Sequence, residues 1–242
     1  MFIFEMRFDK QIVLVTGGSN GIGAAIVKRF VDEGARVIVF DIKKPAQEVE
    51  FFKVDICDEE QIKQAVEQID KIDVLVNNAG IYFQEPIVNT SKESLDRIID
   101  VNVKGPYLMC KHCIPKILLS KGNIVNIASG LGVVPESSSP AYCSSKAAVI
   151  MLTKCLAQEY AREGIRVNSV LPGPIDTPLL RKSFENDADK VVCENKNPMR
   201  RIGKPREVAN IVVFLASEEA SYVTGGMYAV DGGESTSSVY SK

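Results

Sequence analysis

Short apolar runs alternate along the chain with longer segments whose apolar residues recur at helical spacing, and this alternation constrains the fold most strongly. The short runs are rich in Val and Ile and mostly lack strict alternation with polar residues, as expected of strands buried on both faces. Strand then helix, repeated, predicts an α/β fold with a doubly wound parallel sheet of about seven strands and helices on both faces. The expected strands are 12–17, 36–41, 50–55, 72–80, 122–129, 165–173 and 226–233, and the expected helices are 22–33, 59–69, 92–119, 142–162 and 206–217.

The connection between the second and third expected strands is unusually short. Only residues 42–49, with Pro45 near the middle, join the two strands. Parallel strands usually need a crossover of about a dozen residues or more, so we expect the helix at this place to be missing or reduced to a turn. No internal repeat, linker or low-complexity tract divides the chain, which is therefore expected to form a single domain over residues 1–242.

Charge and hydropathy exclude several kinds of partner. The 29 Lys and Arg residues are balanced by 31 Asp and Glu residues, and no basic block is present to neutralise the phosphates of a nucleic acid. No apolar run approaches the ~18 residues of a membrane helix, and the first residues lack the features of a signal peptide. The six cysteines are scattered through expected core segments, which is typical of reduced thiols. The sequence thus predicts a cytoplasmic protein with neither nucleic acid nor membrane as a partner.

A glycine-rich turn, TGGSNGIG, follows the first expected strand. Gly17 lets the chain reverse, while Gly21 and Gly23 leave room for backbone to approach a pyrophosphate at the N-terminus of the next helix. Asp41 closes the second strand, where a carboxylate can accept hydrogen bonds from both ribose hydroxyls of an adenosine and would repel a 2'-phosphate. This favours NAD over NADP, with the lysine pair at 43–44 as an alternative partner for such a phosphate.

Tyr142 and Lys146 lie four residues apart in an expected helix and therefore share one of its faces. A phenol has a pKa of about 10, and an ammonium a few Å away lowers this pKa toward the range in which the phenol transfers protons at neutral pH. Ser129 lies thirteen residues before Tyr142, after another apolar run. Each residue alone has an ordinary structural interpretation, but together with the glycine turn they indicate a redox site.

In this order and spacing the motifs resemble those of the short-chain dehydrogenase/reductase family, which has a Rossmann-type fold, from about Lys10 to Glu234. The family pattern T-G-x-x-x-G-x-G falls on Thr16–Gly23, N-N-A-G on Asn77–Gly80, and Y-x-x-x-K on Tyr142–Lys146. The resemblance implies a cofactor half at about 10–130 and a catalytic and substrate half at about 130–234. The catalytic residues that it implies are Asn102, Ser129, Tyr142 and Lys146. The implied cofactor contacts are Gly17, Ser19, Asn20, Gly21, Ile22, Gly23, Asp41, Asp55 and Ile56 beside the adenine, Asn78, Ala79, Gly80, Tyr142, Lys146, Pro172, Gly173, Ile175, and Thr177 at the nicotinamide carboxamide.

The resemblance also implies separate chemical roles for the four catalytic residues. Ser129 would bond the substrate oxygen, and Tyr142 would take or return the hydroxyl proton as hydride passes to or from the nicotinamide. Lys146 would hold the cofactor ribose and, with the positive nicotinamide ring, lower the pKa of the tyrosine. Asn102 would anchor a water that connects the lysine to solvent. No metal is required by this chemistry.

The segment Cys110–Cys113 has the C-x-x-C spacing found in some zinc and redox sites. A structural zinc site usually takes four ligands, and no second C-x-x-C exists in the chain, so we expect core cysteines in the middle of a helix and no metal. His112 is the only histidine, and no G-x-S-x-G surrounds Ser129. A Ser-His-Asp hydrolase is therefore excluded.

Two classes of function remain. One is an NAD-dependent dehydrogenase for a secondary alcohol or its ketone; the other is a regulatory protein that binds a nucleotide without chemistry. The intact set of Ser129, Tyr142, Lys146 and Asn102 favours the enzyme. Within enzymes, a sugar or polyol dehydrogenase competes with an NADPH-linked 3-oxoacyl thioester reductase, and the predicted NAD preference favours the former.

Three segments are expected to meet the substrate. Residues 174–200 should cover it, although their side chains show no clear signature, and polar groups of Gln84, Glu85 and Ser137–Ser139 are candidates to meet its hydroxyls. An ordinary polar loop explains these serines equally well. The expected helices 92–119 and 142–162 carry more apolar positions than one sheet face requires, and in the family such helices pack against their copies. We therefore expect a homotetramer or a homodimer.

Overall fold

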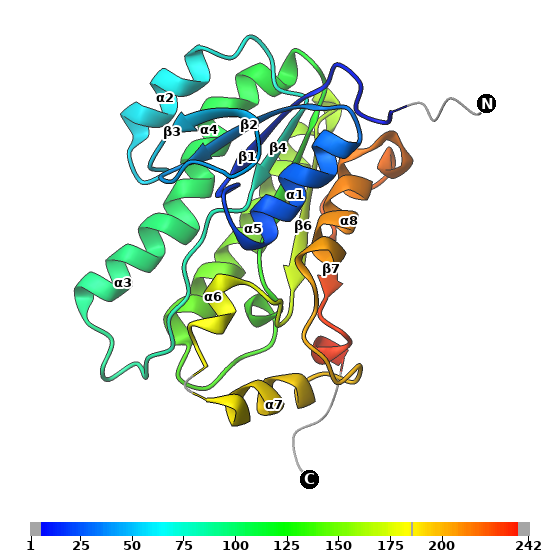
Figure 1. Ribbon diagram of the computed structural model, residues 1–242. Helices are drawn as coiled ribbons and strands as arrows, with labels where there is room; N and C mark the ends of the chain where they lie inside the picture. Colours follow the sequence, from blue (N-terminus) through cyan, green and yellow to red (C-terminus); the bar gives the residue numbers. More distant parts are fainter. Residues whose placement is uncertain (1–5, 185, 237–242) are drawn as a thin grey trace, which may run out of the picture.

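The computed structural model describes residues 6–184 and 186–236, which contain seven parallel strands in one sheet (Figure 1). Across the sheet the strands run in the order β3, β2, β1, β4, β5, β6, β7. From β1 the chain first adds strands on one side, β2 and β3, and then crosses to the other side for β4 to β7. Sheets of this kind bind ligands in the crevice at this switch point, outside the carboxyl ends of the strands. The strands are β1 (Ile12–Thr16), β2 (Arg36–Asp41), β3 (Glu50–Lys53), β4 (Val74–Asn77), β5 (Asn123–Ile127), β6 (Arg166–Pro172) and β7 (Met227–Val230).

Helices cover both faces of the sheet, as the sequence predicts. Side chains alternate between the faces of β1, so that Ile12 and Leu14 pack into one apolar core while Val13 and Val15 pack into the other. The first core lies under α2 (Glu59–Glu67), α4 (Gly105–Leu118) and α5 (Pro140–Tyr160); the second lies under α1 (Gly21–Asp32) and α8 (Pro205–Ala216) (Figure 1).

The eight residues between β2 and β3 form no helix. In the register of this pair, Ile38 lies opposite Glu50 and Asp41 opposite Lys53. The connection must therefore return by only three residue steps, about 10 Å, and cross one strand spacing of about 5 Å. Eight extended residues reach about 26 Å. A short edge strand thus makes the usual crossover helix unnecessary.

The expected helix 92–119 is interrupted by a wider turn. It consists of α3 (Lys92–Ile99), a π-helical turn (Asp100–Lys104) and α4. Such turns often occur at functional sites because they displace a helix residue from its regular position. Here the turn carries Asn102, which is fully buried.

Some strands are shorter than expected. The expected strand 72–80 is reduced to β4, and 226–233 is reduced to β7. In the first case residues 78–80 leave the sheet and line a cavity at its carboxyl edge. Apolar composition alone does not distinguish the end of a strand from the buried loop that follows it.

The segment 174–200 contains two short helices, α6 (Pro178–Arg181) and α7 (Asp187–Asn195), which lie beyond the carboxyl end of β6 (Figure 1). Thr177 caps α6 by accepting a hydrogen bond from the Leu180 N–H, and Asn186 forms a capping box with Asp189 at the start of α7. Among the described residues, no helix is both long and apolar enough to cross a membrane.

Candidate active site

A cavity of about 1250 Å³ opens at the carboxyl edge of the sheet. Its lining residues come from the ends of β1, β2, β4, β5 and β6 and from α5, α6 and α7. Of the residues predicted for the site, Ser19 and Asn102 do not line this cavity, although their neighbours do. The predicted residues that line it are Gly17, Asn20, Gly21, Ile22, Gly23, Asp41, Asp55, Ile56, Asn78, Ala79, Gly80, Ser129, Tyr142, Lys146, Pro172, Gly173, Ile175 and Thr177.

The glycine turn is packed so closely that side chains cannot replace its hydrogens. A Cβ on Gly23 would lie 2.0 Å from the Gly17 carbonyl oxygen, and one on Gly17, which has φ +64°, would lie 2.8 Å from the Ala79 Cα. The Asn78 amide holds the turn by donating to the Thr16 and Gly17 carbonyls at 3.0 and 2.9 Å. This close approach of backbone leaves a concave surface against the cavity.

The N-terminus of α1 faces this surface. Within the described chain, no side chain caps its first turn and no acidic residue lies there. Its N–H groups therefore keep their capacity to meet an anion, which the helix dipole also favours. The turn and the helix fit the pyrophosphate of a dinucleotide.

Asp41 is held in place by backbone donors. Its Oδ2 accepts from the Ser19 N–H and its Oδ1 from the Lys43 N–H, both at 3.0 Å. The Ser19 hydroxyl donates to the Lys43 carbonyl, so this side chain closes the loop rather than reaching the cavity. Lys43 lines the cavity beside Asp41, and both Lys43 and Lys44 are exposed. The carboxylate is thus a fixed acceptor, and a lysine lies next to it.

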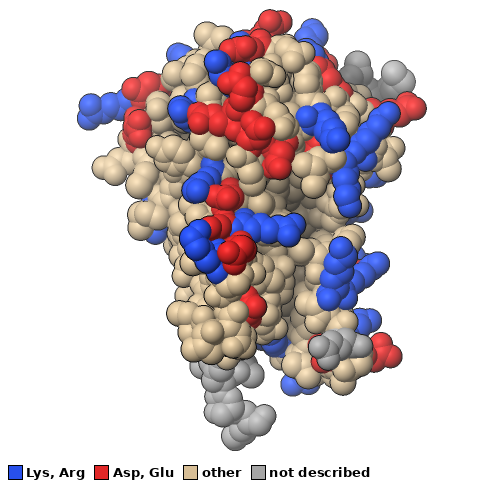
Figure 2. Space-filling view, turned by 90° about the vertical axis from the view of Figure 1, so that its left-hand side faces the viewer, with Lys and Arg blue, Asp and Glu red and all other residues tan. Residues whose placement is uncertain are grey.

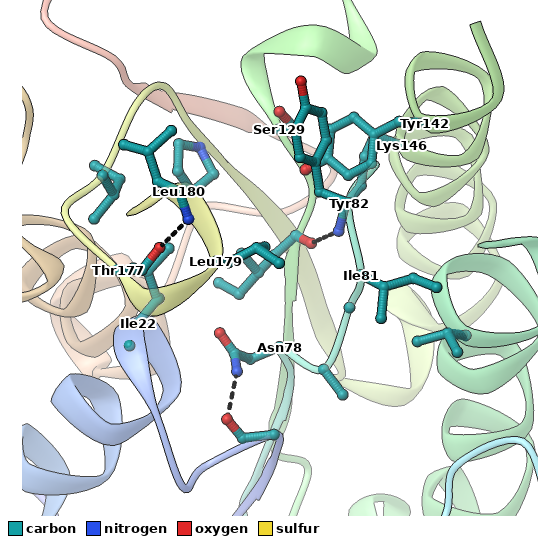
Figure 3. Close-up of a pocket in the computed structure, with 18 of the residues that line it drawn as sticks. Ile22, Asn78, Ile81, Tyr82, Ser129, Tyr142, Lys146, Thr177, Leu179 and Leu180 are labelled. Carbon is teal, nitrogen blue, oxygen red and sulfur yellow. Dashed lines mark hydrogen bonds between the residues drawn. The ribbon is translucent and has the colours of Figure 1, made fainter. Parts of the chain in front are cut away.

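Tyr142, Lys146 and Ser129 gather at one side of the cavity, with Asn78 and Ile22 farther along it (Figure 3). Burial raises the pKa of Tyr142 to about 12, and hydrogen bonding with Ser129 offsets only part of this effect. The Lys146 Nζ lies 5.8 Å from the centre of the Tyr142 ring and donates to the Ile127 carbonyl at 3.0 Å.

Lys146 is an almost fully buried ammonium, with 5% of the residue exposed. Burial lowers the pKa of Lys146 to about 8, because the charged form loses solvation. The group therefore remains mostly protonated at neutral pH. Lys146 is not among the groups that set the pKa of Tyr142 in the structure, so its predicted effect on the phenol stays a prediction for the complex with cofactor.

Asn102 connects the loop after β4 to α5, the helix that carries Tyr142 and Lys146. Its side chain accepts from the Ile81 N–H and donates to the Ile81 carbonyl, both at 2.9 Å, and it also donates to the Ser145 hydroxyl. A Cβ on Gly80 would lie 3.3 Å from the Asn102 Oδ1 and 3.4 Å from the Lys146 Nζ. The π-turn therefore fixes the loop after β4 close to the lysine. The predicted water between Asn102 and Lys146 stays a prediction.

Sequence reasoning missed a polar group at the far side of the tyrosine. The Tyr82 ring packs edge-on against Tyr142 with centroids 4.8 Å apart, and its hydroxyl donates to Glu136. Glu136 and Lys196 form an ion pair of 2.8 Å, and both line the cavity. The position of Tyr82, two residues after the N-N-A-G turn, is the one signal in the sequence for this group.

Only one of the polar residues predicted to meet substrate hydroxyls lines the main cavity. Gln84 lines the cavity, whereas Glu85 and Ser137–Ser139 do not. The Gln84 amide donates to the Ser137 carbonyl and the Ser139 hydroxyl donates to Glu136. Ser138 has φ +59° and turns the chain. These serines therefore fasten two loops together, and Ser137 lines a second, smaller cavity next to the main one.

The C-x-x-C segment lies in the middle of α4, as predicted. Cys110 and Cys113 are buried in the core, and burial raises the pKa of Cys110 to about 12, so the thiol stays protonated. His112 and Lys111 lie within hydrogen-bond distance of Glu59 on α2. Throughout residues 6–184 and 186–236, no group of three or more His, Cys, Asp or Glu side chains is arranged to hold a metal.

Comparison with known proteins gives the family. A family model described as enoyl-(acyl carrier protein) reductase matches residues 17–235. The chain is 38% identical to a 3-oxoacyl-(acyl-carrier-protein) reductase of Thermotoga maritima, covering 94% of this chain and 99% of the relative. It is 34% identical to a meso-2,3-butanediol dehydrogenase of Serratia marcescens, covering 96% and 97%.

A solved structure agrees with these relatives. The ligand-free aldohexose dehydrogenase of Thermoplasma acidophilum superposes with a TM-score of 0.92, at 41% identity and with 97% of each chain covered. The chain belongs to the short-chain dehydrogenase/reductase family. It is an enzyme of the alcohol and carbonyl oxidoreductase class, as predicted, which disfavours the alternative of a regulatory protein that binds a nucleotide without chemistry.

Proposed function

We propose that the enzyme interconverts a secondary alcohol of a sugar, polyol or similar hydroxylated compound and its carbonyl, with NAD as the hydride carrier. The observation that carries the cofactor assignment is the Asp41 carboxylate, fixed at the end of β2 by two backbone donors. A carboxylate there matches the two hydroxyls of an adenosine ribose, and it repels a 2'-phosphate.

The residues proposed to hold the cofactor follow the cavity from end to end. Asn20, Ile22 and the glycines of the turn bind the pyrophosphate with the α1 N-terminus, and Asp55 and Ile56 flank the adenine. Thr177 already accepts from the Leu180 N–H, so its hydroxyl proton is available for the nicotinamide carboxamide. The remaining proposed contacts are Ser19, Asn78, Ala79, Gly80, Pro172, Gly173 and Ile175.

The proton-transfer step is assigned to Tyr142. Ser129 binds the substrate oxygen and Tyr142 takes its proton in oxidation or returns it in reduction. A bound nicotinamide dinucleotide supplies the hydride acceptor and, when oxidised, a positive ring. Burial raises the pKa of Tyr142 to about 12 without it. The ammonium of Lys146, fixed by the Ile127 carbonyl, then favours the phenolate.

The charges of the cavity support a neutral, hydroxylated substrate. A thioester on a phosphorylated carrier arm brings negative charge, and acidic side chains outnumber basic ones in the lining. On the face shown in Figure 2, Lys and Arg lie beside Asp and Glu rather than in a continuous basic field. The acidic lining residues are Asp41, Asp55, Glu93, Asp96, Asp100, Glu136, Asp189 and Glu234, and the basic ones are Lys43, Arg97, Lys146 and Lys196.

The alternative is an NADPH-linked 3-oxoacyl thioester reductase. The relative from Thermotoga maritima carries that activity in its name, and Lys43 lines the cavity next to Asp41, where it is a possible partner for a 2'-phosphate. The butanediol and aldohexose dehydrogenases among the relatives support the alcohol assignment instead.

A substrate panel with both cofactors tests the proposal. It contains aldoses, polyols, hydroxysteroids and an acetoacetyl thioester, each assayed with NAD(H) and NADP(H). We expect the highest kcat/KM for NAD-dependent oxidation of an aldose or polyol. A higher kcat/KM for the thioester with NADPH would replace this proposal by the reductase.

We also propose that the protein works as a homotetramer or homodimer in the cytoplasm. Tyr107 and Met151 leave 58% and 57% of their surface exposed on α4 and α5, which supports packing between copies. All six cysteines are free thiols, which suits a reducing compartment. A monomeric mass at micromolar concentration by light scattering would contradict the assembly.

A further inference from the structure

Glu136 is the meeting point of three segments at the substrate end of the cavity. Its Oε2 accepts from the Tyr82 hydroxyl at 3.1 Å and from the Ser139 hydroxyl at 3.0 Å, and its Oε1 accepts from the Lys196 Nζ at 2.8 Å. Tyr82 comes from the loop after β4, Ser139 from the start of α5, and Lys196 from the end of α7. One carboxylate therefore ties the covering helix α7 to the loops around the catalytic tyrosine.

This carboxylate is close to the reacting centre and borders open space. The Tyr82 side chain contacts both groups: its ring packs edge-on against Tyr142, and its hydroxyl donates to Glu136 (Figure 3 shows the two rings side by side). Glu136 and Lys196 line the main cavity and also an adjoining cavity of about 320 Å³. The pair thus forms part of the wall between two hollows, where a ligand can reach it.

The chemistry of the pair suits a hydroxyl group. Burial raises the pKa of Glu136. The hydrogen bond and charge of Lys196 and the hydrogen bonds of the Ser139 and Tyr82 hydroxyls lower it by more, so the pKa is below its ordinary value and the group is ionised at neutral pH. A carboxylate accepts about four hydrogen bonds, and the three in place leave one acceptor position on Oε1. An ammonium offers three N–H donors, of which Glu136 receives one.

The pair itself has no net charge, and the nearby Glu234, which lines both cavities and acts electrostatically on Lys196, makes the site unfavourable for an anion. The pair offers an acceptor and donors side by side, and a hydroxyl group is both donor and acceptor. A site that hydrogen-bonds a substrate hydroxyl rejects the analogue without that hydroxyl, because its own polar groups are then left unpaired.

We propose that Glu136, held by Lys196, determines substrate specificity by binding a second hydroxyl of the substrate, beyond the carbon that reacts at Tyr142. This inference rests on the proposed polyol or sugar oxidation and names the residue that selects for it. Tyr82 sets the spacing between the two hydroxyls, since it lies between Glu136 and Tyr142 and contacts both. Compounds with one hydroxyl use the Ser129–Tyr142 end alone.

The test compares Glu136→Gln with wild type on three kinds of substrate. These are the polyhydroxylated compound with the highest kcat/KM, its monodeoxy analogues, and a monohydric secondary alcohol. Glutamine keeps the shape but removes the charge and leaves Lys196 without its partner. We expect KM for the polyol to rise about tenfold or more with kcat changed less than about threefold, the pattern of lost uniform binding.

The decisive readout is selectivity. Wild type should discriminate against one monodeoxy analogue by at least about tenfold, and Glu136→Gln should lose this discrimination while kcat/KM for the monohydric alcohol stays within about threefold. Lys196→Met keeps the Glu136 carboxylate but removes its ion-pair partner, so this variant should lose part of the discrimination against the monodeoxy analogue. Glu194→Gln is the matched charge control, because Glu194 lies on α7 outside both cavities, and thermal melts verify that each variant is folded.

The possible failures are distinct. Equal loss for the polyol and the monohydric alcohol, or discrimination that survives in Glu136→Gln, would overturn the role of Glu136 and leave the proposed function in place. A wild type that oxidises the monohydric alcohol as well as any polyol would overturn the proposed function and this inference together.

Discussion

The two ends of the cavity are built in different ways. At the glycine turn the wall is backbone against backbone, and a Cβ on Gly23 would lie 2.0 Å from a carbonyl oxygen. At the opposite end the wall consists of long side chains from distant segments, joined by the Glu136–Lys196 ion pair. The first end admits almost no alternative residue. At the second end we expect substitutions to change the chemistry of the wall and to leave the fold intact.

This difference separates what the enzyme must keep from what it can vary. In the proposed function the turn holds a cofactor that many reactions share, so its surface follows from main-chain geometry. The substrate end can exchange side chains on α6 and α7 without disturbing the sheet, because these helices lie beyond the end of β6 (Figure 1). Relatives named for a thioester reductase, a butanediol dehydrogenase and an aldohexose dehydrogenase are consistent with such variation.

The largest effect is expected between the two ends, at the proton-transfer group. Tyr142→Phe keeps the ring that packs against Tyr82 but removes the hydroxyl, so kcat/KM should fall by about 10³-fold while NAD affinity changes less than about twofold. Steady-state kinetics and isothermal titration calorimetry with NAD measure the two quantities. Activity within tenfold of wild type would show that another group carries the proton.

The next effect tests the rigidity of the cofactor end. Gly23→Ala forces a methyl group against the Gly17 carbonyl, and we expect a loss of about 3 kcal/mol in the free energy of unfolding together with weaker NAD binding. Gly130→Ala is the matched control, since the nearest atom to its added Cβ is 3.7 Å away. Urea denaturation of both variants is the measurement. Similar stability of the two would mean that the turn adapts more easily than its geometry indicates.

A smaller effect is expected from the acceptor at the end of β2. Asp41→Ser removes the charge but keeps a hydroxyl, so the ratio of kcat/KM for NAD to that for NADP should fall by about 100-fold. Lys43→Met is the companion variant, because Lys43 lines the same part of the cavity. Wild-type preference for NADP, lost in Lys43→Met, would reverse the cofactor assignment.

The smallest effect concerns stability and pH. The pKa of Lys146, about 8 in the fold, lies below the ordinary lysine value of 10.5. Between these two pH values the unfolded chain holds more protons than the folded one, so the free energy of unfolding rises with pH. Relative to Lys146→Met, wild type without cofactor should therefore gain about 2 kcal/mol between pH 7 and pH 10.

Urea denaturation of both proteins at the two pH values measures this gain, since the other titrating groups cancel in the difference. A constant difference between wild type and Lys146→Met would mean that the buried ammonium is better solvated than its 5% exposure indicates.

Most of the fold was predictable from the sequence because parallel strands are buried on both faces and appear as short Val- and Ile-rich runs. The missing helix between β2 and β3 followed from chain length alone. The ends of β4 and β7 were not predictable, because the sequence pattern does not show the loop hydrogen bonds that follow these strands: the Asn78 N–H donates to the Thr16 hydroxyl, and the Gly233 N–H donates to Asp231.

The candidate site also contains residues that the sequence predicted and residues that it did not. The glycines, Asp41 and the Ser129, Tyr142, Lys146 group were predicted, and the structure brings them to one cavity. Glu136 and Lys196 were not, because they are 60 residues apart and meet only through tertiary packing. A lone Glu in a polar loop carries no periodic or spacing signal, so its partner is visible only in three dimensions.

The eight-residue connection between β2 and β3 has a consequence for how the chain folds. Closing a loop costs entropy that grows with its length, about (3/2)RT ln n, so joining β2 to β3 costs about 0.8 kcal/mol less than joining β1 to β2 across residues 17–35. Contacts between residues close in sequence also form fastest. The edge of the sheet that presents Asp41 is therefore expected to assemble early, before the distant segments that carry Glu136 and Lys196 come together.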